Sequence, residues 1–228
     1  MANHLDLEEQ EQLEEIKHFW SKYGNFISAV LVAVVLSVAA WNGYHYWQRS
    51  QAAQAAAMFD EMTRSVASGA LDKTERTFND MKERYPRASY THQAGLALAK
   101  MASDAGQAEV AKAALQWVTD KASDDGYVAI AQLRLANIYM DAKQYPEALK
   151  VLDAVKSEAF GSLVSDRKGD VLFLQGQRDL AKAAYLAAYK SFDERSEYRR
   201  LVRVKLNALG LEPEPAKVLA QSAADGER

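Results

Sequence analysis

The segment FISAVLVAVVLSVAAW, residues 26–41, decides the first feature of the fold, because it is apolar apart from two serines. It lies within a longer run, residues 23–47, that contains no Asp, Glu, Lys or Arg. A helix of about 20 apolar residues, rising about 1.5 Å per residue, crosses the ~30 Å hydrocarbon core of a bilayer. Residues 23–47 are therefore predicted to form a single transmembrane helix. A buried core helix and a cleaved signal peptide are the alternatives for such a run.

Both edges of this run favour a membrane span. Aromatic rings, which lie at the headgroup level of a bilayer, gather there: Phe19, Trp20, Tyr23, Trp41, Tyr44, Tyr46 and Trp47. Residues 1–22 form an acidic tail with six acidic and two basic residues, whereas a signal peptide begins with a short basic region. Basic residues flank the span evenly, with Lys17 and Lys22 before it and Arg49 and Arg64 after it, so the residues alone leave its orientation open.

Residues 48–211 are predicted to form one soluble helical domain. They are rich in good helix formers, and their apolar residues recur at spacings of three and four. The residues after the span include 26 Lys and Arg and 25 Asp and Glu, so the net charge of −3 comes from the acidic tail. The missing basic stripe argues against nucleic acid as a partner. The absence of cysteine excludes disulfides, thiolate metal sites and cysteine nucleophiles.

A repeat runs through this domain. Inter-helix turns are expected at Gly69, Gly106, Lys143 and Gly176, which are 37, 37 and 33 residues apart. Five residues after each turn stand Thr74, Ala111, Ala148 and Ala181, and nine after stand Phe78, Leu115, Leu152 and Tyr185. Seven residues before each turn, where two helices of a hairpin approach closely, stand Met62, Ala99, Ala136 and Gly169. This period predicts an all-α solenoid of about four helical hairpins that share one core. A non-repetitive helical bundle is the alternative.

The carboxyl-terminal end is expected to close the stack. An amphipathic helix is predicted from Tyr198 to Leu209, with Leu201, Val204 and Leu209 on the side that caps the last hairpin. The remaining segment EPEPAKVLAQSAADGER, residues 212–228, is polar and contains two prolines. It is predicted to be a disordered tail.

The spacings of the repeat match the tetratricopeptide pattern of a small residue in the first helix, Ala-x3-Phe in the second, and a terminating proline such as Pro86. The stretch IAQLRLANIYMDAKQYPEALKVLD, residues 130–153, fits this pattern best. Together with the junction of tail and span, residues 16–51, the layout resembles the ancillary SecYEG translocon subunit family, also called YfgM-like proteins. The likeness covers nearly the entire chain.

This resemblance implies a protein of the bacterial inner membrane that crosses the bilayer once. It implies a cytoplasmic amino terminus and a periplasmic repeat domain. The implied partners are the SecYEG translocon and the membrane-anchored periplasmic chaperone PpiD, besides the lipid bilayer itself. Unfolded exported polypeptides are a further candidate partner, because the family is expected to help newly exported chains reach periplasmic chaperones.

The residues themselves give no sign of an enzyme. The four histidines, His4, His18, His45 and His92, lie far apart and in no metal-ligand spacing. The glycines occur singly at turns rather than in a phosphate-binding loop, and no nucleophile motif is present. We therefore expect neither catalysis nor a metal or other cofactor.

Partner binding is expected in the groove that the first helices of the hairpins form, since stacked helical repeats leave an extended concave face there. Counting from the turns predicts that this groove is lined by Leu96, Lys100, Leu133, Asn137, Met140, Asp166, Asp170 and Phe173. The alternative for these residues is that the apolar ones form core and the polar ones are only solvated. A clamp for a peptide carboxylate is not evident, because acidic residues are mixed with Lys100, Arg134 and Asn137.

Two functions follow from these features. The first is a membrane-tethered interaction protein of the export machinery. The second is a tetratricopeptide scaffold in envelope assembly or stress signalling without translocon contact.

Overall fold

The structure is a computed structural model, and it describes residues 7–213, with side chains from Leu13 onward except that of Glu15. Within these residues all regular structure is helical. Two units can be separated, residues 1–53 and residues 54–228, and the first helix, α1 (Leu7–Ala67), runs from one into the other. Residues 1–6 of the predicted acidic tail and residues 214–228 of the predicted disordered tail lie outside the described part.

The first unit consists of the amino-terminal part of α1, which is long and apolar enough to cross a membrane. Its large apolar side chains are exposed on all sides, as a helix surrounded by lipid requires. Ser37, a polar residue in the middle of the run, donates its hydroxyl proton to the carbonyl of Ala33 at 2.7 Å. That bond satisfies the hydroxyl inside the helix, which is the arrangement that a hydrocarbon environment demands.

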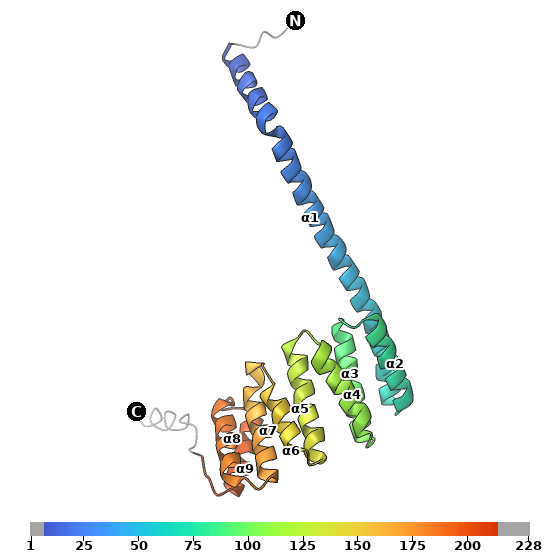
Figure 1. Ribbon diagram of the computed structural model, residues 1–228, viewed down its shortest axis with the longest axis vertical. Coiled ribbons are helices and arrows are strands. Elements are labelled where there is room, and N and C mark those ends of the chain that lie inside the picture. Colours follow the sequence, from blue (N-terminus) through green and yellow to red (C-terminus); the bar gives the residue numbers. More distant parts are fainter. Residues whose placement is uncertain (1–6, 214–228) are drawn as a thin grey trace, which may run out of the picture. The chain divides into compact units, whose positions relative to one another are not determined.

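The second unit is a stack of helical hairpins (Figure 1). The last part of α1 pairs with α2 around the turn at Gly69, and further hairpins and a single final helix follow along the chain. Figure 1 shows these helices side by side in the order of the sequence. Their bounds are α2 (Leu71–Arg84), α3 (Ser89–Asp104), α4 (Ala108–Lys121), α5 (Asp125–Asp141), α6 (Tyr145–Asp153), α7 (Gly161–Leu174), α8 (Arg178–Ser191) and α9 (Glu197–Ala208), with a 3-10 turn, η1 (Glu158–Phe160), before α7.

The predicted turns are confirmed by the backbone. Each has a residue in the left-handed region, with φ of 74°, 71°, 57° and 78° at Gly69, Gly106, Lys143 and Gly176. In each, the next residue donates its N–H to the carbonyl five positions earlier, as in Ala70 to Ser65 at 3.0 Å. This bond satisfies a carbonyl at the end of the helix, and glycine is favoured there because it adopts positive φ without strain.

The close contacts predicted around the turns are also confirmed. The positions five and nine residues after each turn are buried, and so are those seven residues before it. At Gly169 the residue must be small, because a Cβ there would lie 2.5 Å from two ring carbons of Tyr185, whereas the first hairpin accommodates the larger Met62. The fold class predicted from sequence, a membrane-span candidate followed by a tetratricopeptide-like solenoid, is therefore confirmed.

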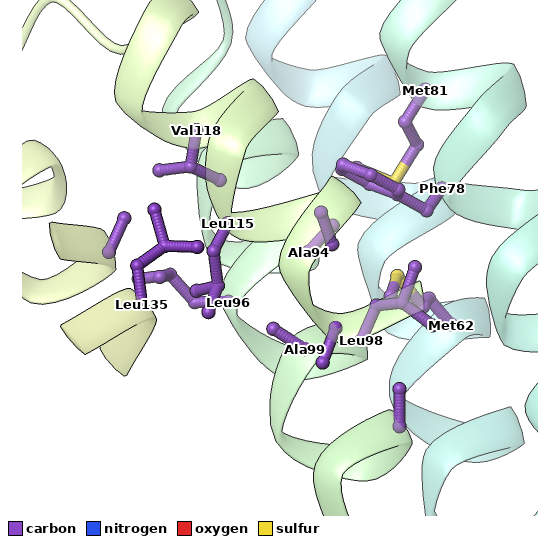
Figure 2. Packing of buried hydrophobic residues seen from close by; sticks show 14 residues of the cluster. Met62, Phe78, Met81, Ala94, Leu96, Leu98, Ala99, Leu115, Val118 and Leu135 are labelled. Atoms are coloured by element: carbon purple, nitrogen blue, oxygen red, sulfur yellow. The ribbon is translucent and has the colours of Figure 1, made fainter. Parts of the chain in front are cut away.

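The largest apolar cluster joins the first three hairpins (Figure 2). Side chains from α1 to α5 meet in it, and the biggest fully buried ones are Met62, Phe78, Met81, Leu98, Leu115, Val118 and Leu135. Burying one such side chain contributes roughly 1.5–3 kcal/mol, so this cluster dominates the stability of the stack. Two smaller clusters continue it through α5–α7 and through α8–α9.

The final helix was predicted correctly, but its packing face was not. Val202 and Leu206 are the buried residues of α9, whereas Leu201 and Val204 are exposed and Leu209 is half-buried. A fifth turn follows α9 at Gly210, with φ of 76°, 34 residues after the fourth. Helix α9 buries the positions four and eight residues before this turn, whereas Arg203, seven residues before it, is exposed, so α9 does not follow the register of the earlier first helices.

Candidate partner-binding surface

A shallow open pocket of about 380 Å³ lies on the face of the first helices, between α3 and α5. Its floor is apolar, with Ala99, Leu115 and Ile138, and its walls are polar. The hairpin register explains this arrangement, because α3 and α5 are the first helices of neighbouring hairpins and α4 lies behind them. The polar walls are formed by Lys100, Ser103, Asp104, Arg134, Asn137 and Asp141.

The polar groups of this pocket differ in whether they already have hydrogen-bond or ion-pair partners within the protein. Lys100 forms an exposed ion pair with Asp104 at 2.5 Å. Arg134 donates from Nη1 to the carbonyl of Leu96 at 2.8 Å, which ties α5 to α3, and burial lowers the pKa of its guanidinium. Asn137 has a buried Oδ1 without a hydrogen-bond partner, and an unpartnered buried amide oxygen is costly. The pocket therefore offers charge of both signs, whereas the unpartnered Oδ1 of Asn137 is itself buried.

The eight predicted groove residues are divided among four environments. Lys100 and Asn137 line the pocket together. Leu96 is buried in the largest cluster, and Leu133 and Met140 pack against the cluster that runs from α5 to α7. Phe173 is exposed near the end of α7.

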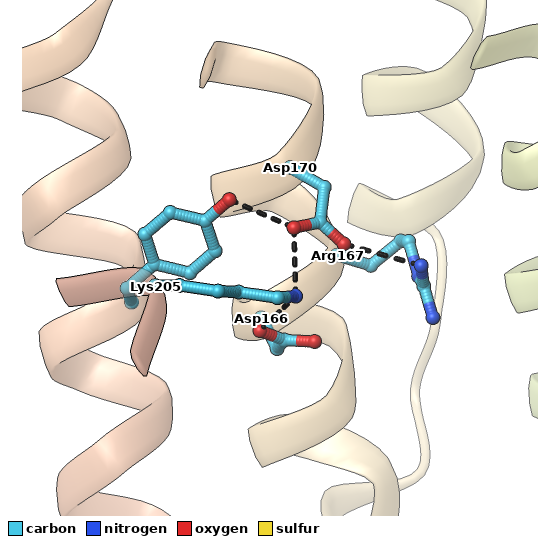
Figure 3. Close-up of polar contacts among 5 residues, drawn as sticks. Asp166, Arg167, Asp170 and Lys205 are labelled. Carbon is cyan, nitrogen blue, oxygen red and sulfur yellow. Dashed lines mark hydrogen bonds and ion pairs between the residues drawn. The ribbon is translucent and has the colours of Figure 1, made fainter. Parts of the chain in front are cut away.

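Asp166 and Asp170 lie instead in a polar cluster between α7, α8 and α9 (Figure 3). Nζ of Lys205 donates to one carboxylate oxygen of each aspartate at 2.7 Å. Asp170 also accepts from Tyr185 Oη at 2.7 Å and from Arg167 Nη1 at 3.1 Å. The cluster fastens α9 to the last hairpin, and it is separate from the pocket between α3 and α5.

Burial dominates the ionisation of this cluster. Asp166 is only 5% exposed, and its desolvation raises the pKa of its carboxyl, although the ammonium of Lys205 opposes the shift. Burial likewise raises the pKa of Tyr185, and its hydrogen bond to Asp170 acts in the same direction. Tyr185 therefore stays protonated and remains a hydrogen-bond donor at neutral pH.

Sequence reasoning missed several residues of these sites. Ser103 and Asp104 line the pocket, and their positions within one or two turns of Lys100 were the available signal. Lys205 had no such signal, since it lies 39 residues from Asp166. Among residues 7–213 no group of three or more His, Cys, Asp or Glu side chains is arranged to hold a metal ion. The polar side chains of the pocket can form ion pairs and hydrogen bonds with a partner.

The chain is similar to known proteins over most of its length. A family model described as a tetratricopeptide repeat-like domain matches residues 17–211. A relative from Escherichia coli strain K12, named ancillary SecYEG translocon subunit, is 31% identical over 206 residues, which cover 89% of this chain and 97% of the relative. A protein of the same name from Neisseria gonorrhoeae is 30% identical over 210 residues, covering 92% of this chain and 100% of that protein.

These matches span the apolar part of α1 and the repeats together, rather than the repeats alone. A helical repeat alone would be shared with many unrelated proteins. The chain therefore belongs to the ancillary SecYEG translocon subunit family and carries a tetratricopeptide repeat-like domain.

Proposed function

We propose that this protein is a non-enzymatic subunit associated with the Sec translocon of the bacterial inner membrane. The observation that carries the proposal is the similarity over about nine-tenths of the chain to proteins named ancillary SecYEG translocon subunit. The structure supports a binding role, because a solenoid with an open pocket presents surface to another protein without catalytic groups.

In this proposal the protein crosses the membrane once, with its amino terminus in the cytoplasm and its repeats in the periplasm. Exported polypeptides that leave SecYEG are then handed to periplasmic chaperones, and the membrane-anchored chaperone PpiD is the partner. The span packs against the channel, since small and weakly polar residues such as Ser28 and Gly43 let another helix approach in lipid. The pocket between α3 and α5 receives the chaperone outside the bilayer.

Copurification tests the association. The tagged full-length chain is expressed at the level of an unrelated single-span protein and extracted in mild detergent. We expect SecYEG and PpiD in the eluate of this chain and not of the control. Recovery of neither partner would leave a scaffold without translocon contact as the function.

A second experiment separates span from domain. Residues 26–41 are replaced by an unrelated apolar span of equal length and orientation. We expect loss of SecYEG with retention of PpiD, because the two contacts use different parts of the chain. Unchanged recovery of both would reduce the span to a tether.

Orientation is tested with alkaline phosphatase fused after Leu211, because this reporter is active only when it is exported. We expect an active fusion. An inactive one, together with an active cytoplasmic reporter at the same position, would reverse the assignment.

A further inference from the structure

The exposed apolar surface of the repeat unit gathers at its carboxyl-terminal end. Among the described residues from 54 onward, Tyr90 is the single large apolar residue before α7 that is exposed. All the others lie in the last three helices: Phe173, Leu174, Leu180, Tyr198, Leu201 and Val204. Solenoids normally end in a helix whose outer face is polar, because that face has no neighbour to cover it. The end of this stack departs from that rule.

Helix α9 carries the most ordered part of this surface. Leu201 and Val204 are 57% and 64% exposed, and the exposed Ala208 follows them at the same side of the helix. Their spacing of three and four residues makes one stripe along α9. The opposite side of the helix is the one that packs on α8 through Val202 and Leu206. The stripe therefore points away from the stack, with the geometry that a second helix would pack against.

The charges that flank the stripe are basic, whereas one acidic residue, Glu197, lies in line with it, four residues before Leu201. Arg200 and Arg203 are exposed, and within residues 7–213 neither forms an ion pair. The other two basic residues of the helix are engaged, Arg199 with Glu194 at 3.6 Å and Lys205 with the aspartates of α7. Glu197, in the first turn, is the single acidic residue of α9. In the part of the chain that the structure describes, the stripe is thus bordered by two arginines without an acidic partner.

The charges beside the stripe indicate which kind of molecule covers it: a second copy of α9, a membrane surface or a helix of another protein. Two copies of α9 packed face to face would bring arginines beside arginines, and like charges across an interface are repulsive. A membrane surface would attract the arginines, but interfacial helices bury a broad apolar face, whereas this stripe is narrow and is interrupted by Glu197 and Asn207. An amphipathic helix with acidic residues beside its apolar stripe matches both the shape and the charge.

We propose that the outward face of α9, the stripe Leu201, Val204 and Ala208 with Arg200 and Arg203 beside it, is a docking site for an acidic amphipathic helix of a partner protein. The site is distinct from the pocket between α3 and α5. It does not depend on the proposed translocon association, because its chemistry is tested with purified protein and peptides.

The test uses the detergent-solubilised full-length chain and two synthetic helical peptides of equal length. Both carry the same apolar stripe, which is flanked by glutamates in one and by lysines in the other. We expect fluorescence anisotropy to show that the glutamate peptide binds about tenfold more tightly, the gain expected from two new ion pairs. Leu201→Gln with Val204→Gln should abolish binding. Arg200→Glu with Arg203→Glu should reverse the preference toward the lysine peptide.

Arg178→Glu with Lys190→Glu is the matched control, since it reverses two exposed charges on α8 and should leave the preference unchanged. Melting curves establish that each variant is folded. Equal affinity for the two peptides, binding of neither, or a preference that survives reversal of Arg200 and Arg203 would overturn the proposal.

The membrane alternative has its own readout. Because the chain has no cysteine, Asn207→Cys places one polarity-sensitive dye beside the stripe. In proteoliposomes with anionic lipid we expect a blue shift of the dye only when the glutamate peptide is added. A blue shift in those liposomes without peptide would assign the face to the membrane instead.

Discussion

The middle and the carboxyl-terminal end of the solenoid use equivalent positions in different ways. Ten residues before their turns stand Leu96 in α3 and Asp166 in α7, and six residues before them stand Lys100 and Asp170. In the middle, Leu96 joins the largest apolar cluster and Lys100 borders an open pocket. At the end, both aspartates turn toward Lys205 and hold the last helix. The repeat register determines the position of a residue in the stack. The chemistry of its side chain determines whether that position belongs to the apolar core, the pocket or a polar cluster.

The apolar contacts in the middle of the stack, called here the apolar junction, and the charged contacts that hold α9, called the charged junction, also differ in their energetics. An apolar junction gains stability in proportion to the area removed from water, and this gain changes little with pH. A buried charged junction must offset the desolvation of its carboxylates, so it adds less net stability but is sensitive to the loss of one partner. Perturbing each junction in turn separates the two cases.

The largest loss is expected in the apolar middle. Leu135→Ala should lower the free energy of unfolding by about 3 kcal/mol, because Leu135 is 1% exposed and its removal leaves a cavity between α3, α4 and α5. Urea unfolding of residues 48–211, which hold all three apolar clusters and are expected to fold without the span, measures the loss. The matched control is Leu201→Ala, on the exposed face of α9, with an expected change under about 0.5 kcal/mol. Similar losses for both would contradict the assignment of the core.

The close approach of α7 and α8 is tested by Gly169→Ala. Alanine normally stabilises a helix relative to glycine by up to about 1 kcal/mol. Here we expect a loss of about 2 kcal/mol, because the new Cβ would lie 2.5 Å from the ring of Tyr185. Gly161→Ala, in the same helix and with no atom within 4 Å of the added Cβ, is the control. A stabilising Gly169→Ala would disprove the packing of this hairpin.

The charged junction is tested by Lys205→Met, which leaves Asp166 buried without its cation. We expect a loss of about 2 kcal/mol at neutral pH. The pKa of Asp166, already raised by burial, rises further without Lys205. A raised folded-state pKa favours folding below that pKa and disfavours it above, so the loss should shrink as the pH falls. Melting of wild type and variant across pH checks this, and a loss independent of pH would show that the charge pairs are not its origin.

The smallest effect concerns His92, which is buried between α4 and α5 against Trp117 and Tyr127. Burial lowers the pKa of its imidazole below 6.5, although the carbonyl of Pro86 and the charge of Asp124 oppose the shift. A lowered pKa stabilises the fold above the unfolded-state pKa, and that stabilisation is lost as the pH falls. His92→Phe should therefore reduce the drop in melting temperature between about pH 7.5 and pH 5.5. An unchanged drop in melting temperature would show that protonation of His92 does not cause it.

The sequence predicts the positions in this fold better than the contacts. Spacing alone located the turns at Gly106 and Gly176 and the small residue Gly169, because a hairpin requires left-handed backbone and close helices at fixed intervals. It did not reveal the turn at Gly210, since the segment that follows contains two prolines and lacks the pattern of a second helix. The predicted packing face of α9 was wrong, because Val202 and Leu206 are the residues that pack on α8.

The sites were harder to predict for a physical reason. The pocket depends on the gap between α3 and α5, which are not consecutive in the sequence because α4 lies between them. The contact of Lys205 with Asp166 depends on how α9 crosses α7, and no local pattern encodes that crossing. Asp166 and Asp170 were thus predicted to line the groove from their register alone, although their side chains are used inside the stack.

The central claim, that the pocket between α3 and α5 receives PpiD while the span holds the channel, has one direct measurement. Asn137→Ala with Asp141→Ala removes an amide and a carboxylate from the pocket wall. Asn79→Ala with Asp80→Ala makes the same change on the exposed side of α2. Recovery of PpiD relative to SecYEG is then measured with the tagged full-length proteins. The account predicts that the ratio falls for the pocket variant and stays at the wild-type value for the α2 variant, whereas an unchanged ratio for both would contradict it.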